Sequence, residues 1–258
     1  GLGGQHTPFA RLLGQMKWTG SIVPFFFRFE RPSRVLRRLR YARRTAARQL
    51  ALDLLGLSGL GWVGYRLVSA WRRWRAGGPR PDRSARAEVV PVFGDWARAV
   101  WEENRSRYGM MGSREPELLN DAYPAGYEGL TRLRVTRDGK DLGWICVLRM
   151  DLEAKQEDRY FGPVVVGVIT DGLARPEDAV TVLDAGAEWL RQSGVDLIIT
   201  NQSHASWRGG LAGLGFFEGP SNFAFYRSPK VEAVLAAAGV GPDDIHITRG
   251  DCDGPRWI

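Results

Sequence analysis

The sequence predicts an α/β fold, with a mixed β-sheet and helices on both faces. The first observation is the unbroken, β-branched apolar run from Val164 to Ile169, which is typical of a strand covered on both sides. The second is the segment 176–193, which opens with proline, has an apolar stripe and is followed by Gly194. The third is another apolar run at 195–200. Strand, helix and strand at this spacing predict a right-handed parallel crossover.

The composition indicates a folded protein with an anionic partner. Of its 258 residues, 44% are hydrophobic, and the formal net charge is +7. The only cysteines, Cys146 and Cys252, exclude a disulfide framework and favour a reducing, cytoplasmic setting. The chain begins at Gly1 without an initiator methionine or a signal peptide, so we expect a piece of a longer protein.

Residues 1–32 are predicted to contain a helix over 6–18 and a strand over 22–29. A helix and one strand cannot bury their own apolar faces, so this region either docks on the later domain or is the end of another domain. A self-comparison favours the second interpretation, because six residues recur at a constant offset of 198. The pairs are His6 and His204, Phe9 and Trp207, Leu13 and Leu211, Trp18 and Phe216, Phe25 and Phe223, and Phe27 and Phe225.

The repeat carries its own test. If residues 6–29 end a first copy, they should match 204–227 in length and path, and residues 1–32 should pack loosely with several aromatic side chains partly in water. A divergent path, or a strand from 22–29 inserted centrally into the sheet of the second copy, would overturn the repeat and with it the two-copy interpretation.

Residues 33–86 are predicted to form a basic helical connector, with helix over 34–76 interrupted in its signal by several glycines, and then a Gly- and Pro-rich linker. Nine arginines lie from Arg28 to Arg48, against one acid, Glu30. The apolar part, 50–71, fits a membrane span, a helix on a membrane surface or a helical pair packed on protein. Asp53 and several glycines disfavour the span.

The same basic segment defines the candidate partners of the connector. An anionic membrane surface fits arginines beside an apolar helix, and implies a peripheral position at the inner face of the membrane. Nucleic acid fits less well, because the segment lacks the interleaved aromatic residues of a stacking platform.

Residues 87–258 are predicted to form the main domain. A short strand is expected at 89–93, with Asp95 and Ser113 capping the two helices that follow. Alternating apolar residues then predict a hairpin around the turn 137–139, ahead of the parallel crossover. A helix led by Ser203, a strand at 222–227 and a helix at 231–238 complete the order.

The element order of 87–228, β-α-α-β-β-β-α-β-α-β-β, resembles the GNAT superfamily of acyl-CoA-dependent N-acyltransferases. The closing helix followed by Gly215-Phe216 is similar to that family's last helix and its usual Gly-Phe pair. The resemblance implies a GNAT-like mixed sheet and an acyl-CoA cofactor, with a substrate amine attacking the acyl thioester directly. Tandem GNAT proteins of this layout exist, and some transfer acyl or aminoacyl groups to lipids or cell-wall precursors.

The cofactor signals of the family are weak in this copy. The family places two glycines in the loop that holds the cofactor pyrophosphate, and the matching positions here are Glu177 and Ala179. Glu177 and Asp178 would satisfy the positive helix end themselves and repel phosphates. Leu211 stands where many members have a tyrosine as general acid. We therefore expect no acyl-CoA on this copy, although the resemblance implies it for the parent protein.

The resemblance places the substrate cleft in the gap between strands four and five, lined by Thr170, Asp171, Asn201 and His204. His204 is the candidate general base, since histidine titrates near neutral pH. Its alternative role is to satisfy backbone groups at a helix start, as Asn201 and Ser203 also do in many proteins. The run 251–254 resembles the opening of a calcium loop but has no closing glutamate, so no metal site is predicted.

Two functions remain open from the sequence. The first is a fragment of a GNAT-like acyltransferase acting on an amine, with a second copy that is degenerate in cofactor binding. The second is a non-catalytic substrate-binding or structural domain of a membrane-associated acyl or aminoacyl transferase. In both, the main partner is a missing N-terminal GNAT-like copy.

Overall fold

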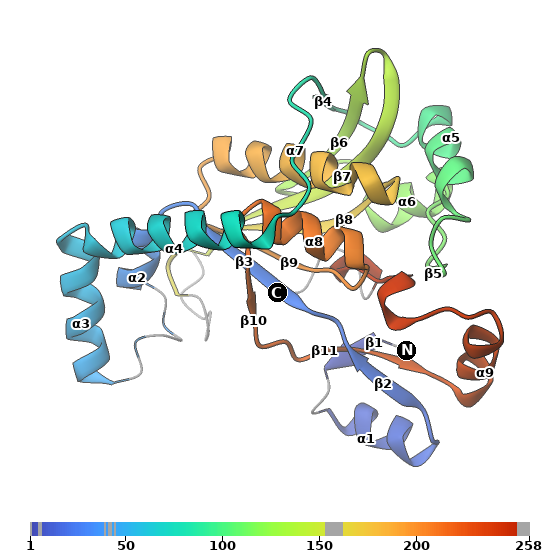
Figure 1. Cartoon of the computed structure of the whole chain (residues 1–258), viewed down its shortest axis with the longest axis horizontal. Helices are drawn as coiled ribbons and strands as arrows, with labels where there is room; N and C mark the ends of the chain where they lie inside the picture. Colours follow the sequence, from blue (N-terminus) through green and yellow to red (C-terminus); the bar gives the residue numbers. More distant parts are fainter. Residues whose placement is uncertain are drawn as a thin grey trace.

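The computed structural model describes residues 2–4, 7–38, 40, 43, 45–152 and 162–251. His6, Cys252 and Asp253 lie outside the described residues, and so does most of the calcium-loop resemblance. Figure 1 shows one large sheet with helices on both sides and a smaller sheet beside it, near the N-terminus.

The main sheet has seven strands in the order β10-β3-β9-β8-β7-β6-β4. Its strands are β3 (Phe25–Phe29), β4 (Arg86–Val89), β6 (Leu130–Arg137), β7 (Lys140–Asp151), β8 (Val165–Ala174), β9 (Leu197–Asn201) and β10 (Phe217–Gly219). β8 and β9 run parallel, and every other neighbouring pair is antiparallel. The predicted mixed sheet and its parallel crossover are confirmed.

The hairpin of β6 and β7 is confirmed as well. Asp138 and Gly139 at its turn have φ angles of 50° and 76°. Positive φ at both central residues is the requirement of the turn that matches the twist of two antiparallel strands, and Asp-Gly meets it at low cost.

Helices cover both faces of the sheet (Figure 1). α7 (Ala179–Gln192) and α8 (Ala205–Gly213) lie on one face, and α2 (Pro32–Arg38), α5 (Asp95–Asn104) and α6 (Pro116–Ala122) lie on the other. The close packing of α7 on β7 depends on Gly186, where a Cβ would come within 2.8 Å of the Ile145 side chain. Trp144 points to the opposite side of β7 and meets the ring of Phe93, ahead of α5, edge-on at 5.0 Å.

Three predicted helix starts are displaced by a few residues. Asp95 is the first residue of α5 rather than its cap, and α6 begins at Pro116 rather than after Ser113. α8 is capped by His204 rather than by Ser203. Proline fits the first turn of a helix because its missing N–H has no partner to lose there.

The smaller sheet has the order β1-β11-β2, with β1 (Leu2–Gly4), β2 (Thr19–Ile22) and β11 (Phe223–Arg227). α1 (Pro8–Gln15) packs on it through Ala10 and Leu13, and α9 (Pro229–Ala237) follows β11. The strand expected over 22–29 is therefore two strands, β2 and β3, in two different sheets.

The expectation that residues 1–32 pack loosely is wrong for β3. This strand is inserted between β9 and β10, with Phe25 opposite Asn201 and Phe27 opposite Phe217. Its apolar side chains pack in the main sheet, and the free energy gained by burying this apolar surface favours docking over loose packing of the N-terminal region. This insertion is the arrangement stated above as overturning the repeat, because β3 does not stay in a sheet of its own copy as the expected form of the repeat requires.

The connector is three helices rather than one. α2 is followed by α3 (Ala46–Leu57) and α4 (Leu60–Ala76), and Gly59 separates the last two with a φ of 73°. That left-handed conformation ends a helix and is accessible to glycine. Among the described residues, no helix is both long and apolar enough to cross a bilayer.

Candidate functional site

The gap between β8 and β9 exists as the resemblance implied. The two strands pair only as far as Ile169 and Thr200, while β8 continues to Ala174. The register between β7 and β8 shifts at Thr170, which leaves this residue in a β-bulge. Beyond the bulge, β8 has a free edge on the side where β9 has ended.

Protein side chains satisfy that free edge. The Tyr108 hydroxyl donates to the backbone oxygen of Ala174 at 2.6 Å, and Nε2 of His246 lies 3.0 Å from the backbone oxygen of Gly172. The Trp207 indole donates to the Tyr108 hydroxyl at 3.0 Å and packs so close to Gly172 that a Cβ there would approach the ring within 2.9 Å. The space along the strand is therefore filled.

Burial keeps these groups uncharged. It raises the pKa of Tyr108 and lowers the pKa of His246 to about 3, so at neutral pH the two side chains are neutral hydrogen-bond donors. Burial also lowers the pKa of His204, whose ring contacts Tyr108 edge-on.

His246 belongs to a segment that crosses the gap, residues 245–251, which we call the C-terminal plug. It starts with β12 (Ile245–His246), which pairs with β5 (Met110–Met111), and ends in a short 3₁₀ turn at 249–251. Thr248 bridges to Gln202, just past β9, and its hydroxyl donates to Asp171 of β8 at 3.0 Å. The plug is thus bonded to both strands that line the gap.

A buried ionic network anchors the plug. Nη2 of Arg114 lies 3.1 Å from Asp171 and 2.7 Å from Asp251, and the Tyr123 hydroxyl donates to the same Asp171 carboxylate at 3.1 Å. The side chain of Arg114 is 2% exposed. Burial raises the pKa of Asp171, whereas Arg114 overcomes burial and lowers the pKa of Asp251. All three nitrogens of the buried Arg114 guanidinium are bonded within the protein, to Asp171, Asp251 and the backbone of Gly112.

Gly250 brings the plug into direct contact with the bulge. A Cβ at this position would lie 2.0 Å from the Tyr123 hydroxyl and 3.2 Å from the backbone oxygen of Thr170. Only glycine permits this approach.

The four residues predicted to line the cleft are all buried. Thr170 donates its hydroxyl to the backbone of Cys146, and Asp171 belongs to the ionic network. Asn201 donates to the backbone of Val23, ahead of the inserted strand β3, and accepts from Arg249.

Nδ1 of His204 accepts from the amide of Ser206, which is the capping role weighed above. Neither of the two cavities described in this chain is lined by any of the four predicted residues.

The start of α7 has acids where the family has a phosphate cradle. Ala179 is fully buried, Glu177 is exposed, and Asp178 lies 3.7 Å from Arg137 without a capping hydrogen bond of its own. Asp178 occupies the N-cap position of α7, so its carboxylate acts on the helix end through its charge rather than through a capping hydrogen bond. The linker lies here as well, because the amide of Asp82 donates to the hydroxyl of Thr181 at 3.0 Å.

Sequence reasoning missed the residues that fill the gap, namely Tyr108, Arg114, His246 and Thr248. Each lies more than 50 residues from Asp171 in the sequence, so no local pattern indicates its contact with the gap. The one available signal was the rarity of histidine, since the chain has only three.

Comparison with known proteins addresses the fold. No protein-family model matches the chain, and no curated protein matches it by sequence. Among solved structures, a GCN5-related N-acetyltransferase from Anabaena variabilis matches 93% of this chain and 48% of its own, at 11% identity and a TM-score of 0.50. This chain has the GNAT fold.

Two further structures share that similarity at lower scores. Saccharomyces cerevisiae N-myristoyltransferase with bound myristoyl-CoA matches 80% of this chain and 48% of its own, with 12% identity and a TM-score of 0.47. The C-terminal domain of a putative lysylphosphatidylglycerol synthetase from Agrobacterium fabrum matches 92% of this chain and 70% of its own, with 12% identity and a TM-score of 0.41. The chain spans about half the length of the first two structures.

Proposed function

We propose that this chain is the second copy of a two-copy acyltransferase, and that it supports an upstream copy rather than transferring acyl groups itself. The observation that carries the proposal is the C-terminal plug, which occupies the gap where the GNAT fold holds the thioester arm of acyl-CoA. In the parent, the upstream copy would bind acyl-CoA and an amine acceptor would attack the thioester.

The plug is costly to displace. A cofactor in the gap would have to replace the bonds of Tyr108 and His246 to β8 and to expel Thr248 from its bridge. Expulsion would also separate Asp251 from Arg114. Removing one partner of a buried ion pair typically costs about 3–5 kcal/mol of folding free energy. The cost would be subtracted from any cofactor affinity.

The start of α7 adds a second barrier. Glu177, Asp178 and Asp82 place three carboxylates near the helix end that would receive the pyrophosphate, and Arg137 pairs with the two aspartates. A helix N-terminus carries roughly half a positive elementary charge and therefore attracts a phosphate, whereas carboxylates at the same place repel it.

Internal symmetry supports the two-copy architecture. Moved by 198 residues, α8 covers 7–15, β10 covers 19–21 and β11 covers 25–29, against 8–15, 19–22 and 25–29 for α1, β2 and β3. The pairing is reciprocal as well: β10 pairs with β3, and β2 pairs with β11. Two copies that exchange their last strands would each contain one inserted strand, so the insertion of β3 fits this form of the repeat.

The exposed side of α1 is where we place the upstream copy. Phe9 and Leu12 are 50% and 51% exposed, while their counterparts at the same offset, Trp207 and Gly210, are buried against β8 and α7. The elements that would cover α1 in the same way would come from residues upstream of this chain.

A second candidate function, a substrate-binding or structural domain at a membrane, is favoured by α4. Its outward residues follow helical spacing, and the α4 outer stripe consists of Leu60, Val63, Leu67, Trp71 and Trp74. Arg75 adjoins it, with its guanidinium stacked on the Trp71 ring, and Trp74 is 80% exposed. Tryptophan and arginine beside exposed aliphatic residues are typical of helices that lie on anionic bilayers.

Calorimetry with acetyl-CoA and with a long-chain acyl-CoA tests the main proposal. This chain should show no binding, and the parent protein should bind one cofactor per chain. A dissociation constant at or below about 10 μM for this chain, or two cofactors per parent chain, would make the second copy a working enzyme and overturn the proposal.

A further inference from the structure

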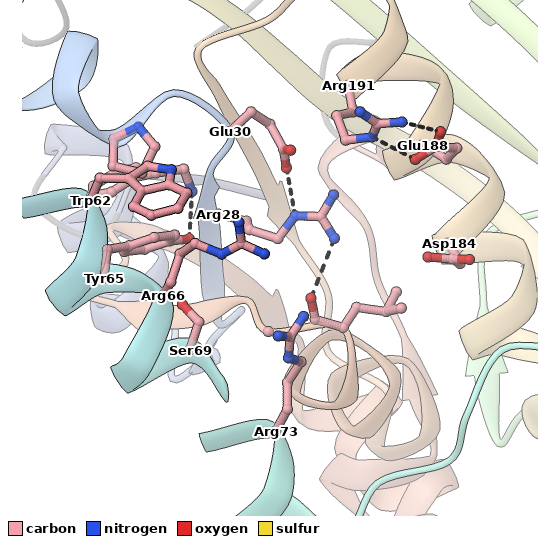
Figure 2. A pocket seen from close by; sticks show the side chains of 14 residues that line it. Arg28, Glu30, Trp62, Tyr65, Arg66, Ser69, Arg73, Asp184, Glu188 and Arg191 are labelled. Atoms are coloured by element: carbon pink, nitrogen blue, oxygen red, sulfur yellow. Dashed lines mark hydrogen bonds and ion pairs between the residues drawn. The ribbon is translucent and has the colours of Figure 1, made fainter. Parts of the chain in front are cut away.

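A cavity of about 440 Å³ lies between α4 and α7, far from the gap in the sheet (Figure 2). One wall is α4, the other is α7, and β3 and the end of α8 form the floor. Its polar lining consists of Arg28, Glu30, Tyr65, Arg66, Ser69, Arg73, Asp184, Glu188 and Arg191. These side chains belong neither to the gap between β8 and β9 nor to the C-terminal plug.

The α4 wall presents two uncompensated cations. Among the described residues, neither Arg66 nor Arg73 has an acidic partner. Arg66 lies over the ring of Trp62, with 4.9 Å from its guanidinium carbon to the ring centre, and the stem of Arg73 lies beside Gly215. Both guanidinium groups therefore line the cavity from positions held by packing.

The α7 wall presents one uncompensated anion. Glu188 is paired with Arg191, and Glu30 on the floor is paired with Arg28 at 2.6 Å. Asp184 makes no ion pair or hydrogen bond with any described residue, and Figure 2 shows its carboxylate directed into the space facing Arg28. Burial raises the pKa of this carboxyl, as expected for a charge that still lacks its partner.

We propose that this cavity binds a small phosphate ester that carries a primary amine. The phosphate would lie on Arg66 and Arg73, and the ammonium group on Asp184. The charges fit this class, because four arginines and three acids line the cavity and the remaining single positive charge matches a ligand of net negative charge.

The shared chemistry has two sources, a phospholipid headgroup and a free phosphoamine. The α4 outer stripe lies on the side of the helix away from the cavity, so a bilayer beneath α4 would place headgroups near the α4 wall. The experiment separates the two sources by using a soluble probe and vesicles in parallel.

The soluble arm measures binding of O-phosphoethanolamine, inorganic phosphate and ethylamine by NMR titration of the whole chain. O-phosphoethanolamine should bind about tenfold more tightly than phosphate, and ethylamine should bind more weakly than both. Asp184→Asn should reduce O-phosphoethanolamine binding to the level of phosphate without changing the phosphate constant. Arg66→Gln with Arg73→Gln should weaken both ligands about tenfold.

Arg75→Gln is the matched control, because Arg75 is on the same helix but stacks on Trp71 outside the cavity. It should leave all three constants unchanged. Thermal unfolding of each variant verifies that it is folded. Equal affinity for phosphate and O-phosphoethanolamine, or an Asp184→Asn variant that binds like the unmodified chain, would overturn the proposal.

The vesicle arm compares phosphatidylglycerol vesicles with and without phosphatidylethanolamine. Tighter binding with the amine lipid, lost in Asp184→Asn, identifies a headgroup, and no difference between the vesicles together with soluble binding identifies a free phosphoamine. Either result supports the site. Since the acyl-CoA experiment does not involve this cavity, the two proposals fail independently.

Discussion

Nε2 of His246 lies 3.0 Å from the backbone oxygen of Gly172, and this hydrogen bond joins the C-terminal plug to the backbone at the free edge of β8, beside the bond from Thr248 to the Asp171 side chain. The ring stacks on Tyr108 and lies 4.9 Å from the ring of Trp207. Nδ1 on the other side of the ring is buried without a partner among the described residues. The plug is therefore held by a histidine that must remain neutral.

Stability should depend on pH through His246. Its pKa is lowered by burial from 6.5 to about 3, so between these values the unfolded chain binds a proton that the folded chain does not. Stability should fall as the pH falls through this window, by up to about 1.4 kcal/mol per pH unit for this group. Urea unfolding between pH 7 and 4 measures the slope.

His246→Gln is the matching variant, because its amide can still donate to Gly172 but does not titrate. Its stability should change less with pH than that of the unmodified chain. Identical slopes for the two proteins would show that His246 is not the group responsible.

Arg114→Met should destabilise the chain strongly. The change leaves Asp171 and Asp251 buried without their common cation, and such a loss typically costs about 3–5 kcal/mol. Denaturant unfolding at pH 7 measures the difference. Arg107→Met is the control, since Arg107 is exposed and, among the described residues, its side chain bonds only to the backbone of Glu103. A loss below about 1 kcal/mol at Arg114 would contradict the ionic network.

The α4 outer stripe should bind anionic vesicles in a salt-sensitive way. Co-sedimentation should be clear at low salt and much weaker near 1 M salt, where the screening length falls to about 3 Å. Trp71→Ser with Trp74→Ser should reduce binding at low salt, because the indoles are 52% and 80% exposed. Val234→Ser, at an exposed apolar site on α9, should have no effect. Absence of binding at low salt, or indifference to salt, would refute this account.

The outer face of α1 should matter only when the upstream copy is present. Phe9→Asp with Leu12→Asp should change the stability of this chain by less than about 1 kcal/mol, since both side chains are half exposed. In the parent protein the same changes should lower the melting temperature markedly. Equal melting temperatures for the parent protein and its variant would contradict the placement of the upstream copy on this face of α1.

The elements of the crossover could be predicted because their signals are local. β8 and β9 are short apolar runs, α7 has its own stripe, and the turn at Asp138-Gly139 needs no distant contact. Even the offset of 198 residues between the two helix-strand-strand units is visible in the sequence and agrees with the element bounds.

The candidate site could be predicted only in part. Thr170 and Asp171 do lie where β8 and β9 separate, because the pairing of the two strands ends with the apolar run at Ile169, although β8 itself continues to Ala174. What fills that space was not visible, since the plug is only seven residues long and Arg114 is 57 residues away from Asp171 in the sequence. In the structure these side chains are buried members of a hydrogen-bonded and ionic network, whereas the sequence had suggested exposed cleft residues.

The placement of β3 and β11 in two different sheets was decided by the tertiary structure alone. The two strands have the same length, and Phe25-Phe26-Phe27 and Phe223-Ala224-Phe225 can each bury an apolar face in either sheet. Which sheet a strand joins depends on the free edges that the rest of the chain presents, and the pairing of Phe25 with Asn201 closes a loop of more than 170 residues. A sequence therefore determines that such a strand forms, whereas its place in a sheet follows from long-range pairing, whose free energy no local pattern contains.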